Sequence, residues 1–498
     1  MHRQWRGSAP PEAFIRPFVG KPSDDPLQET DLTMNPASDT SAAAAVQPAG
    51  TRGSQMTAFI AGMQTRQIPQ AVREAASRAL VDFIGCAVGA SQDAPVKPLL
   101  PVIKSWQASG KARIFCGGRT TPALAALANG TMTHAMDYDD THPMGAGHPS
   151  GPCWSTALAL AEDHGYSEQQ AIAAFIAGFE VMAKLGGGGP PGVGRSLQRR
   201  GLHPTSVFGR AGAAAVACSL MGLDESRIAY ALGVAATTAG GLVGSFGTHS
   251  KPFHAGKAAM DGILAAQLAA NGFISATHLY ELEKGLLDVF IQNREVEVPP
   301  LDDFGVNWEL LGNSFKPFAS CRATHASTQA ARSIAAQVKG RKITGVRARV
   351  HPNALVTAGK TAPRTPLEGK FSVPFCISLG LRGYHVVQTD FVDSTMRDPA
   401  VAELVPLVKL EAVADQPPYR AFLDVTLDNG ETVKAHTDIV MGHPDNPMSW
   451  EALRAKFDGL VVPVMGAAKT AELFEAARSF GPPGSLAKLS SLLAGSDN

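Results

Sequence analysis

Cysteine is scarce in this sequence, and none of it is arranged in pairs. The 498 residues contain six cysteines, none of them in a C-x-x-C pair, and the intervals between them are long and irregular. This spacing argues against a compact zinc or iron–sulfur motif and against a disulfide framework. Isolated cysteines in alanine-rich surroundings are typical of small core side chains, so we expect a reducing, cytoplasmic location.

An excess of charge and long apolar runs are missing as well. Lys and Arg number 44 against 44 Asp and Glu, so the net charge gives no reason to expect nucleic acid or an anionic membrane as a partner. No run reaches the roughly 18 apolar residues of a transmembrane helix. An anionic ligand would therefore have to be held by local positive charge. Residues 1–54 are rich in Pro, Ser, Ala, Gly and Asp and are predicted to form a disordered extension.

Helical periodicity dominates the chain from about residue 55 to residue 313. Apolar residues recur at three- and four-residue spacing in alanine-rich segments that are apolar on most faces, which predicts a buried multi-helix bundle. The many glycines beside alanine in these segments favour close helix–helix packing. The segments are 122–136, 153–163, 168–184, 205–221, 224–240 and 254–271.

The pattern changes to alternating residues after about residue 314. Residues 344–351 alternate like a half-buried strand, and 421–427 and 431–437 flank an Asn-Gly turn that predicts a β-hairpin. Helical periodicity returns after Ser449. We therefore predict a mainly α protein: a large helical domain over 55–313 and 441–498, with a smaller α/β domain over 314–440.

The densest chemical cluster is HAMDYDDTH (134–142), followed by GHPSG (147–151). It places three carboxylates and three imidazoles at the end of a predicted helix and in the loop behind it. Such a density of ionisable groups is costly unless they are solvated, paired or used. Helix capping combined with surface polarity is the plain alternative for any single residue.

Two further motifs precede predicted helices. In GLHPTS (201–206), Thr205 or Ser206 is expected to cap the helix, which leaves His203 beside a helix N-terminus that attracts carboxylates. In THSKPFHAG (248–256), Lys251 precedes a proline, so we expect it on a turn at the start of the next helix, where it could clamp an anion. An ordinary surface lysine is the alternative.

The last motif is KPFASCRATH (316–325), near the expected domain junction. Lys316 and Arg322 form a basic pair there, and Arg322 could bind a carboxylate through two hydrogen bonds or serve a structural ion pair. No dinucleotide fingerprint, P-loop or nucleophile elbow is present. The motifs together favour binding of a polycarboxylate by Lys and His while a histidine moves a proton beside a carboxylate.

In order and spacing, these four motifs resemble the MmgE/PrpD family, which includes 2-methylcitrate dehydratases, cis-aconitate decarboxylases and iminodisuccinate epimerases. The resemblance covers roughly residues 56–490. It implies a helical domain with an α/β lid, a homodimer, an active site between the two domains, and no metal or organic cofactor. It also implies five site residues, with His148 transferring the proton and Lys251 and His203 binding carboxylates: Asp137, Thr141, His148, His203 and Lys251.

One departure from the family and two rival functions complete the prediction. Decarboxylase-like members carry a tyrosine where this chain has Phe318, which keeps the ring and lacks the hydroxyl. Phe318 and Arg322 complete the predicted substrate-binding set. The first rival is a metal-dependent hydrolase, with ligands from the cluster His134, Asp137, Asp139, His142 and His148. The second is a catalytically inactive carboxylate-binding scaffold, for which Phe318 is the main argument.

Overall fold

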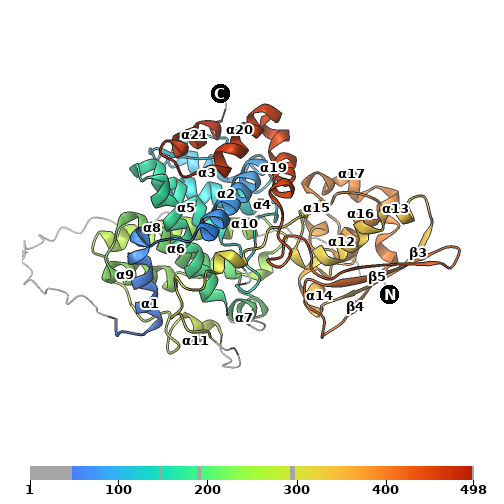
Figure 1. Ribbon diagram of the computed structural model, residues 1–498, viewed down its shortest axis with the longest axis horizontal. Coiled ribbons are helices and arrows are strands. Elements are labelled where there is room, and N and C mark those ends of the chain that lie inside the picture. Colours follow the sequence, from blue (N-terminus) through green and yellow to red (C-terminus); the bar gives the residue numbers. More distant parts are fainter. Residues whose placement is uncertain (1–46, 146, 188–191, 292–295, 297, 496–498) are drawn as a thin grey trace, which may run out of the picture. The chain divides into compact units, whose positions relative to one another are not determined.

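The computed structural model describes residues 47–145, 147–187, 192–291, 296 and 298–495 (Figure 1). Within these residues the protein is mainly helical and contains a smaller α/β part, as the sequence predicts. The predicted extension over 1–54 falls largely outside the described residues, and the first helix begins at Arg52. None of the helices in the described part of the chain has the length and apolar character needed to cross a bilayer.

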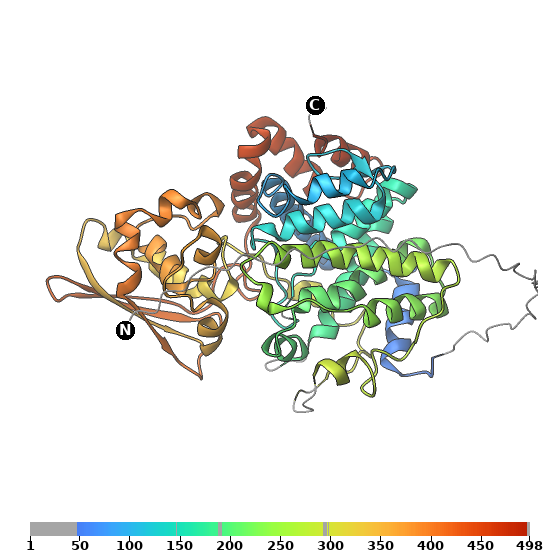
Figure 2. The same ribbon diagram turned by 180° about the vertical axis from the view of Figure 1, so that it is seen from behind.

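Helices fill the first part of the chain and return at its end (Figure 2). The alanine-rich segments all form helices, close to their predicted bounds. The helices are α1 (Arg52–Gly62), α2 (Gln70–Gly89), α3 (Leu99–Ser105), α4 (Pro122–Ala135), α5 (Ser150–His164), α6 (Glu168–Gly186), α7 (Val193–Arg199), α8 (Pro204–Met221), α9 (Glu225–Thr237), α10 (Ser250–Ala270), α11 (Leu286–Phe290), α19 (Trp450–Met465), α20 (Ala467–Arg478) and α21 (Ser485–Leu492).

Helices α4 and α10 cross with almost no side chain between them. A Cβ atom on Gly130 of α4 would lie 2.8 Å from the Cα of Gly256, and a Cβ on Gly256 would lie 2.1 Å from the carbonyl oxygen of Leu127. Only glycine permits so close an approach of two backbones. The crossing brings His134, in the last turn of α4, to Lys251, in the first turn of α10.

The C-terminal helix α19 packs on α2 and reaches the loop that follows α4. Lys456 of α19 donates hydrogen bonds of 2.6 Å to Asp82 Oδ1 of α2 and of 2.6 Å to the carbonyl oxygen of Tyr138. Both side chains of the ion pair are buried, so neither charge has water to solvate it and each depends on the other. The last part of the chain thus helps to fix the 137–142 loop.

The α/β part contains a four-stranded sheet in the order β4-β3-β5-β6. Strands β3 and β4 are parallel and the other pairs are antiparallel. The predicted hairpin is confirmed as β5 and β6, and Gly430 in its turn has a φ of 84°. The elements are β3 (Ile343–Val350), β4 (Val408–Ala412), β5 (Ala421–Leu427), β6 (Thr432–Thr437), α12 (His325–Ser333), α13 (Ala335–Val338), α14 (Pro352–Ala358), α15 (Pro366–Gly369), α16 (Val373–Leu381), α17 (Asp393–Met396) and α18 (Pro399–Ala402), with a separate pair β1 (Ala112–Arg113) and β2 (Arg119–Thr120).

The sheet has its own hydrophobic core, formed by side chains from Ala326 to Ala435, beside the larger core of the helices. The larger core also takes in Phe375 and Phe391 from the α/β part. The proposed domain bounds, 55–313 with 441–498 and 314–440, stay a prediction.

Two local expectations about helix starts are wrong. The N-cap of α8 is His203, and Thr205 and Ser206 lie inside the helix, because Pro204 already occupies the first helical position. Lys251 is the second residue of α10, not part of a preceding turn. Pro252 is tolerated there because the first turn has no i→i−4 hydrogen bond to lose.

Candidate active site

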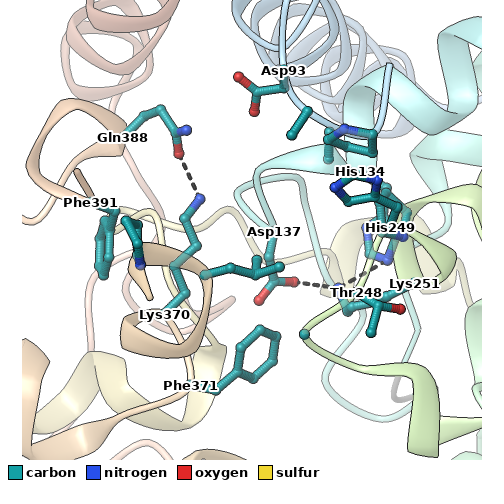
Figure 3. Close-up of a pocket in the computed structure, with 17 residues that line it drawn as sticks. Asp93, His134, Asp137, Thr248, His249, Lys251, Lys370, Phe371, Gln388 and Phe391 are labelled. Atoms are coloured by element: carbon teal, nitrogen blue, oxygen red, sulfur yellow. Dashed lines mark hydrogen bonds and ion pairs between the residues drawn. The ribbon is translucent and has the colours of Figure 1, made fainter. Parts of the chain in front are cut away.

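Two lysines converge on one buried carboxylate at the end of α4. Asp137 Oδ1 accepts hydrogen bonds of 2.7 Å from Lys251 Nζ and of 2.9 Å from Lys316 Nζ (Figure 3 shows the Lys251 bond). The three side chains are at most 6 % exposed. Burial alone would raise the pKa of Asp137, but the lysines and the neighbouring histidines hold it well below its ordinary value. Asp137 is therefore ionised, and it neutralises only one of the two ammonium groups.

The backbone of Asp137 adopts a left-handed conformation with a φ of 54°. Asp and Asn tolerate this region better than other residues with a Cβ atom, at a cost of about 1 kcal/mol. Lys316 offsets that cost, because its Nζ also donates a 2.7 Å hydrogen bond to the carbonyl oxygen of Asp137. One lysine thus fixes both the side chain and the main chain of this aspartate.

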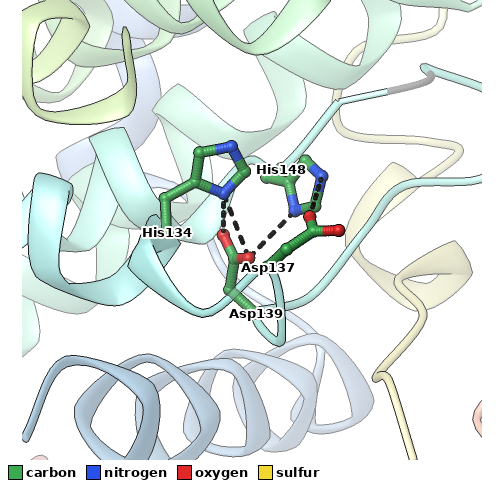
Figure 4. Close-up of side chains that lie close together, drawn as sticks. All are labelled: His134, Asp137, Asp139 and His148. Atoms are coloured by element: carbon green, nitrogen blue, oxygen red, sulfur yellow. Dashed lines mark hydrogen bonds and ion pairs between the residues drawn. The ribbon is translucent and has the colours of Figure 1, made fainter. Parts of the chain in front are cut away.

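A second carboxylate, Asp139, lies between two histidines (Figure 4). His134 Nδ1 lies 2.9 Å from Asp139 Oδ2, and His148 Nδ1 lies 3.2 Å from Asp139 Oδ1. His134 Nε2 lies 3.0 Å from Lys251 Nζ. The contact of His148 is poorly aligned for a hydrogen bond, and the backbone N–H of this residue donates to Thr205 Oγ1 at 3.1 Å. A continuous polar path runs from Lys251 to His148.

The protonation states follow from these contacts. Burial lowers the pKa of His134 to about 3 and also lowers the pKa of His148, although Asp139 opposes both shifts. Asp139 itself is ionised, because the two histidines hold its pKa well below the ordinary value against the effect of burial. An ionised Asp139 favours the Nδ1–H tautomer of a neutral His148. Its Nε2, 4.0 Å from Asp137 Oδ1, then carries a free lone pair and can accept a proton.

His203 lies behind this group, at the N-terminus of α8. Its ring stacks on the ring of His134 with 5.6 Å between centroids, and its Nδ1 lies 3.0 Å from His254 Nδ1. Burial and the neighbouring cationic groups hold the pKa of His203 well below its ordinary value. The predicted placement beside a helix N-terminus is confirmed.

A cavity of about 220 Å³ opens beside His134, and Thr141, His148, His203 and Lys316 do not line it. Asp137 and Lys251 line it, together with three polar residues for which the sequence holds no signal (Figure 3). These are Asp93, from the turn after α2, and Lys370 and Gln388, from the α/β part. They stand in no motif, and only the tertiary fold brings them to Asp137.

Thr141 pairs with Ser314 through its backbone. Its N–H donates to the carbonyl oxygen of Ser314 at 2.7 Å, while its Oγ1 is buried and has no hydrogen-bond partner. The neighbouring Asp140 accepts from Ser150 Oγ at 2.5 Å and from Asn313 Nδ2 at 2.6 Å, and burial raises its pKa to about 7. The hydroxyl of Thr141 is thus buried and unpaired, and Thr141 does not line the cavity.

Phe318 and Arg322 do not line the cavity. The ring of Phe318 is buried against His325 and lies under the guanidinium of Arg332. Arg322 Nη1 donates a long 3.4 Å hydrogen bond to the carbonyl oxygen of Phe315. The hydroxyl that Phe318 lacks would therefore not change the cavity lining described here.

Four of the five residues of the predicted metal cluster come together. One ligand atom each of His134, Asp137, Asp139 and His148 lies within 4.8 Å of the others. His142 points elsewhere, with its Nε2 3.2 Å from Glu309 Oε2. An ion in this group would stand close to the ammonium group of Lys251, which already contacts His134 and Asp137 and would repel it.

The fold and this site define a mainly helical protein with a buried cluster of Lys, His and Asp beside a small cavity. Comparison with known proteins gives the family. The MmgE/PrpD N-terminal domain matches residues 54–299 and the MmgE/PrpD C-terminal domain matches residues 318–479, so the chain belongs to the MmgE/PrpD family.

The chain is also similar to two mammalian proteins and one fungal protein. The chain is 30% identical over 358 residues to the cis-aconitate decarboxylase of Mus musculus, which covers 68% of this chain and 72% of the relative. The identity to the Homo sapiens cis-aconitate decarboxylase is 30% over 355 residues, with the same coverage. A cis-aconitate decarboxylase of Aspergillus terreus is 26% identical over 294 residues, which is 56% of this chain and 59% of the relative.

Proposed function

We propose that this protein is a lyase that acts on a small di- or tricarboxylate, with cis-aconitate and 2-methylcitrate as the first substrates to test, and that it moves a proton at a carbon next to a carboxylate. The observation that carries the proposal is the pair Lys251 and Lys316 on the single carboxylate of Asp137. Lys251 lines the cavity and shares its carboxylate partner with Lys316, so its ammonium group can still attract an anion that enters. Membership of the family and the names of the relatives support a carboxylate as that anion.

The proposed chemistry assigns one role to each group. Negative charge develops next to the substrate carboxylate in decarboxylation and in α-proton abstraction, and the lysine ammonium groups stabilise it in a site with little water. His148 Nε2 accepts the proton in an elimination or epimerisation. In a decarboxylation it must carry a proton beforehand, and a bound polyanion favours this by raising the pKa of the imidazole. Thr141 and His203 complete the substrate site.

The test is proton exchange in deuterated buffer, followed by NMR, over a panel of di- and tricarboxylates with chelator-treated protein. We expect protein-dependent deuterium incorporation, loss of water or loss of carbon dioxide with at least one acid, because the lysines and His148 need no added cofactor for these steps. If folded protein causes none of these changes in any acid of the panel, the proposal is contradicted.

The metal-dependent hydrolase remains a second candidate, because four ligand atoms lie within 4.8 Å of one another. The repulsion from Lys251 predicts weak binding, so we expect less than one equivalent of zinc or manganese in purified protein and no loss of carboxylate turnover after chelation. Stoichiometric metal, together with activity that chelation abolishes, would favour this candidate instead.

We propose two further properties from the family resemblance: a homodimer, and an α/β lid over residues 314–440 that closes on the helical domain. The hydrogen bond of Lys370 in the α/β part to the carbonyl oxygen of Met136 supports the second, since it joins the 314–440 segment to the end of α4.

A further inference from the structure

The strongest unexplained feature of the cavity is Lys370, which follows α15. Its ammonium group is buried, with the residue only 4 % exposed. Nζ donates hydrogen bonds of 2.5 Å to the carbonyl oxygen of Met136 and of 2.6 Å to Gln388 Oε1 (Figure 3 shows the Gln388 bond). Both acceptors are neutral. Among the residues that the structure describes, no carboxylate lies within ion-pair distance of this lysine.

A buried ammonium group without a carboxylate partner is costly. Burial lowers the pKa of Lys370 to about 8, while Asp137 and Asp93 pull it the other way. Two neutral acceptors leave the third N–H of the ammonium group free. That donor belongs to a side chain that lines the cavity.

The two cavity lysines belong to different parts of the fold. Lys251 comes from the first turn of α10 and contacts Asp137, whereas Lys370 comes from the α/β part (Figure 3). Asp137, which lies between them in that view, is already bonded to Lys251 and Lys316. An acid in the cavity can therefore meet one cationic group from each part of the fold.

We propose that Lys370 anchors a second carboxylate of the substrate, remote from the reacting carbon, and so restricts the enzyme to acids with at least two carboxylates. The inference rests on the proposed function, because it assumes that the cavity receives a carboxylic acid. The negative charge of Asp93 repels an anionic substrate and so acts against binding at Lys370. Asp93 is half-buried and lines the cavity; burial raises its pKa, while Lys370 and Lys97 lower it.

Calorimetric titration with two probes tests the anchor. Tricarballylate offers three carboxylates, and butyrate offers one. Lys370→Met removes a charge-assisted hydrogen bond to the ligand and should therefore weaken tricarballylate binding roughly 10- to 100-fold. Butyrate binding should change by less than about threefold, because a single carboxylate stays near Lys251. Equal weakening of both probes, or of neither, would overturn the anchor, since a purely structural role through Met136 makes no distinction between them.

A second variant keeps the test decisive if Lys370→Met does not fold. Asp93→Asn removes a negative charge from the cavity lining and should tighten tricarballylate binding roughly two- to fivefold. The matched control is Lys339→Met, which alters an exposed lysine that does not line the cavity and should change neither affinity. Unchanged tricarballylate affinity in Asp93→Asn would also count against the anchor.

Turnover separates the two proposals. Wild-type protein that binds tricarballylate through Lys370 but converts no acid of the panel would defeat the lyase and leave the anchor standing. If the wild-type protein converts an acid but Lys370→Met changes the affinity of neither probe, the anchor alone is wrong.

Discussion

Replacing His148 with asparagine is expected to lower kcat by roughly 100- to 10,000-fold, the usual contribution of a positioned general acid–base. The neutral imidazole faces Asp139 through Nδ1 and leaves Nε2 free, and asparagine offers no group that can exchange a proton near neutral pH. The measurement is steady-state turnover of the acid that the NMR panel identifies, with tricarballylate affinity measured alongside. Affinity should change far less than kcat, because the lysines remain.

The matched control for this variant is His164→Asn. His164 ends α5 with a side chain 46% exposed, and it lies beside its neighbour Asp163 and the ring of Tyr166. It should keep the wild-type kcat. A value of kcat for His148→Asn within a few-fold of the wild type would remove this histidine from the proposed mechanism.

Replacing Asp137 with asparagine is expected to cost about 3–5 kcal/mol of unfolding free energy, because it leaves two buried ammonium groups without their carboxylate. Asparagine keeps the shape and tolerates the left-handed conformation at this position, so the loss reports the charge and not the backbone. Chemical denaturation of both proteins measures the difference. Tricarballylate should restore part of the loss in the variant by supplying a replacement anion.

The pH dependence of this difference has a definite sign. The folded pKa of Asp137 is depressed, so its contribution to stability is present above the unfolded pKa of about 3.9 and is lost as the pH falls through the folded value. The gap between the wild type and Asp137→Asn should therefore be constant from about pH 5 to about pH 8 and shrink only below about pH 4. The double variant Asp137→Asn/Lys251→Met should recover part of the stability. A gap that grows in acid would contradict this account.

The sequence predicts those features that arise from local pattern. Alanine-rich segments with helical spacing became helices because their apolar faces can be buried only against one another, and the hairpin around Gly430 follows from its turn residues. The cluster from His134 to His148 could be anticipated because its members are neighbours along the chain. His203 and Lys251 could be anticipated from the helix starts that hold them.

The rest of the site depends on contacts between distant segments. Lys370, Asp93 and Gln388 stand in ordinary surroundings in the sequence and become neighbours only through the packing of the α/β part near α2 and α4. Distant contacts also explain why the prediction for Phe318 and Arg322 differs from the structure. Their motif predicts a place in the site, but Phe318 packs against His325 and Arg322 bonds to the carbonyl oxygen of Phe315. The proline after Lys251 suggested a turn, yet Lys251 lies in a helix. The rule against α conformation before proline weakens in the first turn of a helix.

The glycine crossing of α4 and α10 has a consequence for how this enzyme can change. Gly130 and Gly256 place backbone against backbone at the crossing, so a larger residue at either position would push the helices apart and separate His134 from Lys251. The distance between these two side chains is therefore fixed by the helix crossing. New substrates are more readily reached by substitutions in the α/β part, where side chains such as Lys370 and Gln388 line the cavity.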